Sequence, residues 1–159
     1  MPEALPTYVL DASIAIKWLL PFSDEPHLAK AEELARDYQD GLISLIAPFV
    51  LSYEVGHALV RAGRRGRISQ DDVRDGYRRF LNWKIPLIHD HSVLQFAVTL
   101  TSTAPISFYD ASYYSLALSR NSVMIHADER FQAAIINTSL DTSVAYLIAN
   151  YLPEIRTSN

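Results

Sequence analysis

The sequence contains no cysteine, and its five glycines do not gather into a phosphate-binding loop. Without cysteine the fold forms no disulfide bond and is suited to a reducing cytoplasm. No apolar run approaches the roughly 20 residues that are needed to span a bilayer, and residues 1–6 lack the basic and apolar segments of a secretory signal. We therefore expect a soluble cytoplasmic protein that does not enter a membrane.

Positively charged residues are outnumbered, with 14 Lys and Arg against 18 Asp and Glu and a formal net charge of −4. This balance excludes a protein that is coated with positive potential. Hydrophobic residues make up 49% of the 159 residues. The length and this apolar content together predict one folded domain, over residues 1–159, rather than a disordered chain.

Short β-rich runs alternate with stretches of helical periodicity along most of the chain. The expected strands are residues 8–10, 42–46, 86–88 and 122–125, and helices are expected from residue 12 and over residues 48–62, 69–83, 91–101 and 107–118. Residues 144–148 fit either a terminal helix or an edge strand, and we favour the helix. The alternation predicts an α/β fold, a three-layer α/β/α sandwich with a mostly parallel central sheet.

Two of the expected strands lead into an aspartate. Asp11 directly follows the apolar residues 8–10, and Asp128 closely follows the run of residues 122–125. Ligands of open α/β folds bind at the carboxyl ends of the strands. Taken singly, however, each aspartate fits the commoner role of a helix N-cap, because a helical stretch follows it.

Two further acids lie on expected helices. Glu54 borders an apolar stripe, and His57 and Arg61 fall beside it at helical spacing. Asp110 lies near the start of another helix, where it can also form a capping box with Ser107. A lone glutamate on a helix is more often partly exposed than buried. Neither acid is informative by itself.

The four acidic segments are informative together, because their sequences and their order resemble those of one family. Residues 9–13, 51–55, 107–111 and 127–131 resemble the four acidic blocks of the PIN-domain family, and most closely of its VapC-like ribonuclease toxins. Residues 17–21 and 46–48 match as well, so the resemblance covers nearly the whole chain. It implies a PIN-like nuclease domain that acts as a magnesium- or manganese-dependent endoribonuclease.

The resemblance implies that Asp11, Glu54, Asp110 and Asp128 are the catalytic and metal-binding residues. A divalent ion held by carboxylates suits phosphodiester cleavage, because it activates water and stabilises charge on the phosphoryl oxygens. It also relieves a repulsion of about 4 kcal/mol between two carboxylates about 4 Å apart at an effective dielectric of about 20. We expect Asp11 and Asp110 to bind the ion directly or through water, and Glu54 and Asp128 to complete its shell or orient the attacking water. Ser13 either hydrogen-bonds a coordinated water or simply occupies the first helical turn.

The five histidines form no zinc-binding spacing, which favours an all-oxygen site. Two of them depart from the family's pattern: His57 stands where relatives often carry Asn, and His126 stands where Thr is usual. We expect His57 to alter contacts with substrate or partner. We expect His126 to alter the hydrogen bonding or the titration of the neighbouring carboxylate of Asp128.

Four arginines and two glycines crowd the stretch from residue 61 to residue 67. We hypothesise that Arg61, Arg64 and Arg65 bind RNA phosphates beside the acidic cleft. Basic residues are also favoured near a helix C-terminus and in a solvated turn, and this interpretation has equal weight.

Resemblance to VapC-like toxins also implies a homodimer and a small antitoxin whose C-terminal segment lies across the cleft. Aromatic residues such as Tyr53 and Tyr109 fit either such an interface or the core. Two other functions stay open. One is a PIN-like binding module that has lost catalysis. The other is a receiver-type signalling domain, which also gathers acids and magnesium at strand ends. That domain requires adjacent acids after an early strand and a lysine at a later strand end, whereas Asp11 is preceded by Leu10 and no strand-end lysine is evident.

Overall fold

The computed structural model describes residues 4–20, 22 and 25–152. Its centre is a sheet of parallel strands in the order β3-β2-β1-β4-β5. The strands are β1 (Thr7–Leu10), β2 (Ser44–Pro48), β3 (Leu87–Ile88), β4 (Val123–His126) and β5 (Ala145–Leu147). The sheet confirms the predicted α/β class, and its described strands are all parallel rather than mostly so.

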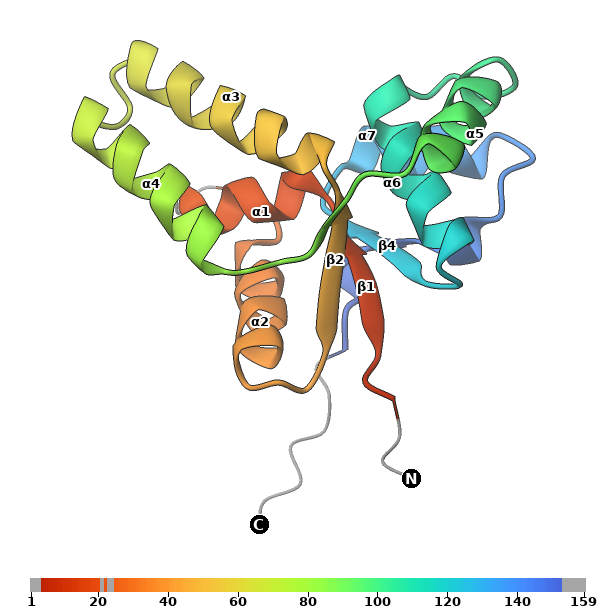
Figure 1. Ribbon diagram of the computed structural model, residues 1–159, viewed down its shortest axis with the longest axis horizontal. Coiled ribbons are helices and arrows are strands. Elements are labelled where there is room, and N and C mark those ends of the chain that lie inside the picture. The colour runs from red at the N-terminus through yellow and green to blue at the C-terminus, as the bar shows by residue number, and fades with distance from the viewer. Residues whose placement is uncertain (1–3, 21, 23–24, 153–159) are drawn as a thin grey trace.

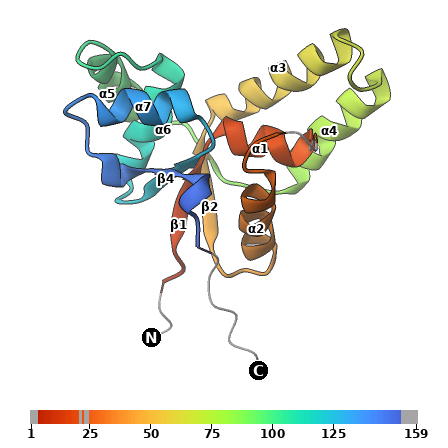
Figure 2. The same cartoon turned by 180° about the vertical axis from the view of Figure 1, so that it is seen from behind.

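Helices connect the strands and cover the sheet on both sides. They are α1 (Ala12–Leu19), α2 (Leu28–Gln39), α3 (Val50–Arg64), α4 (Gln70–Asn82), α5 (His91–Thr101), α6 (Phe108–Ser119) and α7 (Glu129–Ile136). Figures 1 and 2 show α1 to α4 on one side of the strands and α5 to α7 on the other. The predicted three layers are present. In the described ranges, no helix has the length and apolar character that crossing a lipid bilayer requires.

Helix α6 lies at the centre of the packing. Its residues 111–117 are all buried, and it contacts β1, β2 and β4. Seven successive buried residues cover every side of a helix, so α6 is enclosed by the rest of the protein. Because α6 is fixed against three strands, the position of Asp110 in its first turn is fixed as well.

The strand order places a topological switch point between β1 and β4. The chain moves outward from β1 through β2 to β3, and then returns to the other side of β1 for β4 and β5. Leu10 pairs with Ile125, and the N–H of Asp11 donates to the carbonyl of Ile125 at 3.1 Å. The β-ladder thus holds Asp11 at the switch point, where ligands of such folds bind.

Helices α3 and α4 form a hairpin that projects away from the strands (Figure 1). Helix α4 starts with a capping box, in which the hydroxyl of Ser69 accepts from the N–H of Asp72 and the Asp72 carboxylate accepts from the N–H of Ser69. Gly76 of α4 faces Leu59 of α3, which is 1% exposed. The two helices approach closely because Gly76 has no side chain.

The observed elements differ from the predicted ones near the C-terminus and in β2. Residues 144–148 are not a helix, so that prediction was wrong. They include β5, which is flanked by short 3-10 turns at Thr142–Val144 and Ile148–Asn150. The reason is the unpaired edge of β4, which offers hydrogen bonds to an extended segment: Ala145 pairs with Met124. The strand expected at residues 42–46 runs instead over Ser44–Pro48, and helix α2 was not predicted.

Alanine substitutions test the packing of the hairpin. A Cβ at Gly76 would lie 2.9 Å from Cδ2 of buried Leu59, whereas a Cβ at Gly56 would meet Cε2 of Tyr77 at an ordinary 3.5 Å. Both substitutions gain roughly 1 kcal/mol of helix propensity, but only the first overpacks a contact, which costs roughly 1–3 kcal/mol. We expect Gly56→Ala to raise the free energy of unfolding in urea and Gly76→Ala to lower it. Equal stabilisation by the two changes would contradict this packing.

Candidate functional site

Three helices begin at an Asp-x-Ser sequence whose aspartate, Asp11, Asp90 or Asp141, is the N-cap. In each, the carboxylate accepts hydrogen bonds from the backbone N–H and the hydroxyl of the serine. These bonds favour the charged form and hold the pKa of Asp90 and of Asp141 below the usual value. Burial has the opposite effect on Asp11 and raises its pKa to about 7, and the carboxylates of Glu54 and Asp110 add to the rise.

The four predicted acids are neighbours in space. Asp11 ends β1, Glu54 lies on α3, Asp110 lies in the first turn of α6 and Asp128 follows β4. Burial raises the pKa of Glu54, and so does the carboxylate of Asp110. Burial likewise raises the pKa of Asp110, with a further contribution from Asp128. The fold therefore brings together carboxylates from four separate segments of the sequence.

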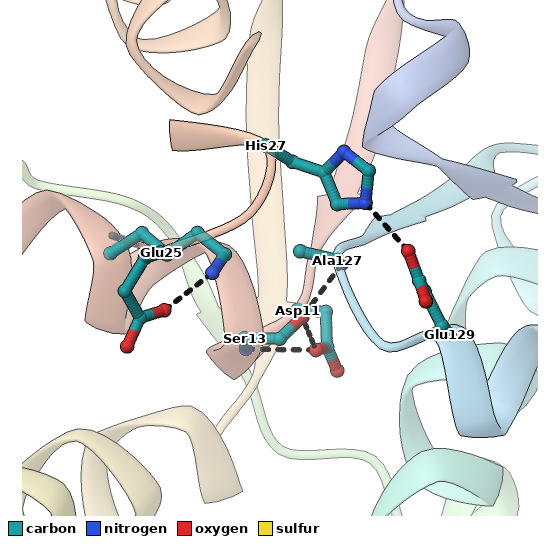
Figure 3. A network of polar contacts seen from close by, with 7 residues as sticks. Asp11, Ser13, Glu25, His27, Ala127 and Glu129 are labelled. Atoms are coloured by element: carbon teal, nitrogen blue, oxygen red, sulfur yellow. Dashed lines mark hydrogen bonds and ion pairs between the residues drawn. The ribbon is translucent and has the colours of Figure 1, made fainter. Parts of the chain in front are cut away.

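Ser13 links the two strand ends that carry Asp11 and Asp128. Its hydroxyl donates to Oδ2 of Asp11 and accepts from the N–H of Ala127 at 2.9 Å (Figure 3). The one proton of this hydroxyl is thus used on Asp11. Ser13 holds the β4 loop and the Asp11 carboxylate in a fixed relation.

His126 supports the same loop from inside the protein. It is fully buried, its Nδ1 accepts from the N–H of Asp128 at 3.2 Å, and its Nε2 lies 3.0 Å from Oε1 of Gln132. These contacts assign the neutral tautomer that carries its proton on Nε2. Burial lowers the pKa of His126 to about 4, so the ring is uncharged at neutral pH. The departure from the family's Thr therefore acts on the backbone of Asp128 by hydrogen bonding.

Tyr113 positions Glu54 and was missed as a site residue in the sequence. Its hydroxyl donates to Oε2 of Glu54 at 2.6 Å, and its ring is 1% exposed. Burial, together with Asp11 and Glu54, raises the pKa of Tyr113 well above its usual value, so the hydroxyl keeps its proton and remains a donor. The available signal was its spacing, three residues after Asp110 on one helix.

The donor chemistry of the cluster fits a hydrated magnesium or manganese ion. In each of the four acids one carboxylate oxygen accepts a hydrogen bond, and the other accepts none from the part of the chain that is described. The engaged atoms are Oδ2 of Asp11, Oε2 of Glu54, Oδ2 of Asp110 and Oδ1 of Asp128. Among the described residues no three His, Cys, Asp or Glu side chains form a group that could hold a metal ion. Magnesium, however, keeps several waters and needs only one or two direct carboxylates.

A cavity of about 750 Å³ lies beside Glu54. One face and the C-terminal end of α3 line this cavity. His57, Arg61 and Arg65 follow Glu54 there at helical spacing. Arg64, which was grouped with these arginines in the sequence, does not line the cavity. The lining therefore changes from anionic near the acids to cationic at the far end of α3.

The chain resembles known proteins in both sequence and fold. A family model described as PIN domain matches residues 8–136. Ribonuclease VapC1 of Mycobacterium tuberculosis, from strain CDC 1551 / Oshkosh and from strain ATCC 25618 / H37Rv, is 34% identical over 88 residues. This match covers 55% of the present chain and 65% of that protein, which is less than two thirds of its length.

A solved structure shares the fold over almost the whole chain. The crystal structure of PAE2754 from Pyrobaculum aerophilum superimposes with a TM-score of 0.60 and covers 92% of this chain and 93% of that one. The sequences are 21% identical. At this identity the likeness supports the α/β fold and nothing about the ligand.

The buried carboxylate of Asp11 makes stability depend on pH. Its pKa is about 7 in the folded state against 3.8 ordinarily, so between these values the folded protein holds a proton that the unfolded chain has lost. The free energy of unfolding therefore falls as pH rises through this window, by about 1.4 kcal/mol per pH unit. The measurement is urea unfolding of metal-free protein. As pH rises from 5 to 8, we expect the free energy of unfolding of Asp11→Asn to rise by about 2–3 kcal/mol relative to that of the parent.

Asp90→Asn is the matched control for this measurement. Asp90 is an N-cap with the same serine contacts, but its pKa is lowered, mainly by the Ser92 hydroxyl. Between pH 5 and pH 8 its carboxylate is ionised in both states, so its substitution adds no pH dependence in this range. Identical pH profiles for the two variants would show that the Asp11 carboxylate is not destabilised by burial.

Proposed function

Because this chain belongs to the PIN domain family, we propose that it is a magnesium- or manganese-dependent endoribonuclease, and the toxin of a toxin–antitoxin pair. The observation that carries the proposal is the cluster of four carboxylates at the switch point of a parallel sheet. The 34% identity to a protein named Ribonuclease VapC1 supports RNA as the substrate. Family membership also favours this function over a receiver-type domain.

Asp11 and Asp110 are the residues that we assign to hold the ion, with Glu54 and Asp128 completing its shell. Such an ion, when bound, places positive charge next to the scissile phosphate and acidifies water. Its charge also favours the ionised form of Asp11, whose pKa is raised by burial.

The remaining contacts prepare the acids for this task. Tyr113 holds one oxygen of Glu54, which leaves the other free to accept a hydrogen bond from the attacking water. Ser13 and His126 fix the backbone of the loop after β4. Carboxylates that are oriented before substrate binds need no reorganisation during the reaction.

Arg61 and Arg65 are the residues that we propose for RNA phosphates. They lie on the cavity face of α3, about 11 and 16 Å beyond Glu54 along the helix axis. In the described part of the chain neither pairs with a carboxylate within 4.0 Å, whereas Arg74 and Arg78 of α4 pair with Asp71 and Asp75. Two arginines without such a partner among the described residues therefore border the cavity.

We further propose that the protein forms a homodimer and binds a small antitoxin. Tyr53, Phe108 and Tyr109 are 68%, 42% and 54% exposed, whereas Tyr113 and Tyr114 are buried. The aromatic residues thus divide between surface and core. The exposed ones lie on α3 and α6 near the acids, where aromatic side chains suit a protein interface.

Cleavage of RNA tests the activity. We expect the parent protein to cut RNA only with added magnesium or manganese, and to lose activity with EDTA. Asp11→Asn and Asp110→Asn should lower the cleavage rate by more than about 100-fold, because both remove a metal-binding carboxylate. Asp90→Asn should keep the parent rate, since Asp90 caps a helix outside the cluster. A parent protein without metal-dependent cleavage would instead support a PIN-like binding module that has lost catalysis.

The salt dependence of RNA binding tests the two arginines. In the non-cleaving Asp11→Asn background, each phosphate contact contributes about 0.7 to the slope of log affinity against log salt for a single strand. Arg61→Gln and Arg65→Gln should each reduce the slope by about this amount. Arg64→Gln is the control, because it removes the same charge from a side chain outside the cavity. A slope that is equally reduced in all three variants would assign binding to net charge alone.

A further inference from the structure

The two sides of the 750 Å³ cavity differ in chemistry. The α3 side presents the arginines, whereas the side formed by α1 and the segment after it presents the apolar residues Ile16, Leu20 and Phe22, together with Glu25, whose carboxylate is paired with Lys17. A single RNA strand has a charged backbone on one side and bases on the other. The charged backbone therefore matches α3, and the bases match the apolar side.

Arg67 lies where these two sides meet. Its guanidinium carbon lies 3.7 Å from the centroid of the Phe22 ring, and both residues line the cavity. Phe22 is half-buried against the core, and the backbone N–H of Arg67 donates to the carbonyl of Ala62 at 3.0 Å. The backbone of Arg67 is therefore held by Ala62, and its guanidinium is held by the Phe22 ring.

The N–H donors of this guanidinium meet no acceptor among the described residues. Within the described ranges the Arg67 side chain makes no hydrogen bond and no ion pair within 4.0 Å, and its guanidinium lies over the Phe22 ring. A planar guanidinium that an aromatic ring already orients loses less freedom when it binds an acceptor pair. The arrangement is a preoriented fork of donors next to an apolar surface.

We propose that Arg67, held on Phe22, recognises a guanine base of single-stranded RNA bound in this cavity. The inference rests on the proposed ribonuclease function and adds a sequence preference to it. Guanine offers two acceptors, O6 and N7, to a guanidinium fork, whereas adenine places a donor beside N7. The Phe22 ring is already covered by the guanidinium, so the ring orients the fork, and the apolar residues Ile16 and Leu20 on the same side of the cavity receive the base. The phosphates are bound by Arg61 and Arg65.

The position of Arg67 separates recognition from cleavage. Arg65, two residues earlier, is the C-cap of α3 and lies about 16 Å along the helix axis from Glu54. The recognised guanine therefore lies several nucleotides from the cleaved bond, on the strand that runs along α3. Cleavage should occur at a constant distance from the guanine.

Short synthetic RNAs test the proposal with the full chain. Oligouridine decamers carry one guanosine, inosine, 7-deazaguanosine or adenosine at the same position, and kcat/KM is measured for each. Inosine keeps both O6 and N7, whereas 7-deazaguanosine lacks N7. We expect guanosine and inosine to be cleaved equally well, and 7-deazaguanosine and adenosine about tenfold less efficiently, which is the size of effect of a good bidentate contact.

Conservative variants locate the effect. Arg67→Lys keeps the charge but not the fork, and should reduce the guanosine-to-adenosine ratio of kcat/KM to about one. Phe22→Leu, which removes the ring and leaves Arg67, should reduce the ratio as well. Arg64→Lys, an exposed arginine outside the cavity, should keep it.

Failure of this inference is distinct from failure of the proposed function. A parent that cleaves all four RNAs equally, or a ratio that persists in Arg67→Lys, overturns guanine recognition and leaves the ribonuclease intact. An equal loss on all four RNAs in Arg67→Lys assigns Arg67 to phosphate and also overturns it. A parent that cleaves no RNA overturns the proposed function, and guanine recognition with it.

Discussion

The hydroxyl of Ser13 makes the contact on which the arrangement of the acids depends. It donates to Asp11 at the end of β1 and accepts from Ala127 after β4, so one side chain ties together the two strands at the switch point. The neutral ring of His126 accepts a hydrogen bond from the N–H of Asp128, the next residue of the same loop. Asp110 is positioned by the packing of α6 against β1, β2 and β4, and Glu54 on α3 is held by the hydroxyl of Tyr113 on α6.

Burial decides which of several similar aspartates is a site residue. Asp11, Asp90 and Asp141 make the same local hydrogen bonds, yet only Asp11 among them has a raised pKa. Local sequence defines an N-cap in all three places, and the tertiary fold removes water from one. Capping and membership of the acidic cluster are therefore compatible roles of Asp11, and of Asp128, which caps α7.

The sequence predicted the elements whose signals are local. The helix that follows Ser69, the helix His91–Thr101 and the acids at the ends of β1 and β4 follow from periodicity and capping. Strand β5 was missed because an edge strand is stabilised by its neighbour, β4, and not by its own residues. Tyr113 and Phe22 were missed as site residues because their partners, Glu54 and Arg67, are distant in sequence. The sequence could not show that Arg65 lines the cavity and Arg64 does not, because this depends on which face of α3 borders the cavity.

The ion pairs of α4 give the projecting hairpin an electrical asymmetry. Arg74 and Arg78 lie against Asp71 and Asp75 on their own helix, whereas Arg61 and Arg65 of α3 have no such neighbours among the described residues. A polyanion that approaches from bulk solvent therefore experiences a torque as well as an attraction, and it is turned toward the α3 side before contact. Above about 0.1 M salt the Debye length falls to about 10 Å or less, so this pre-alignment acts only during the last step of encounter.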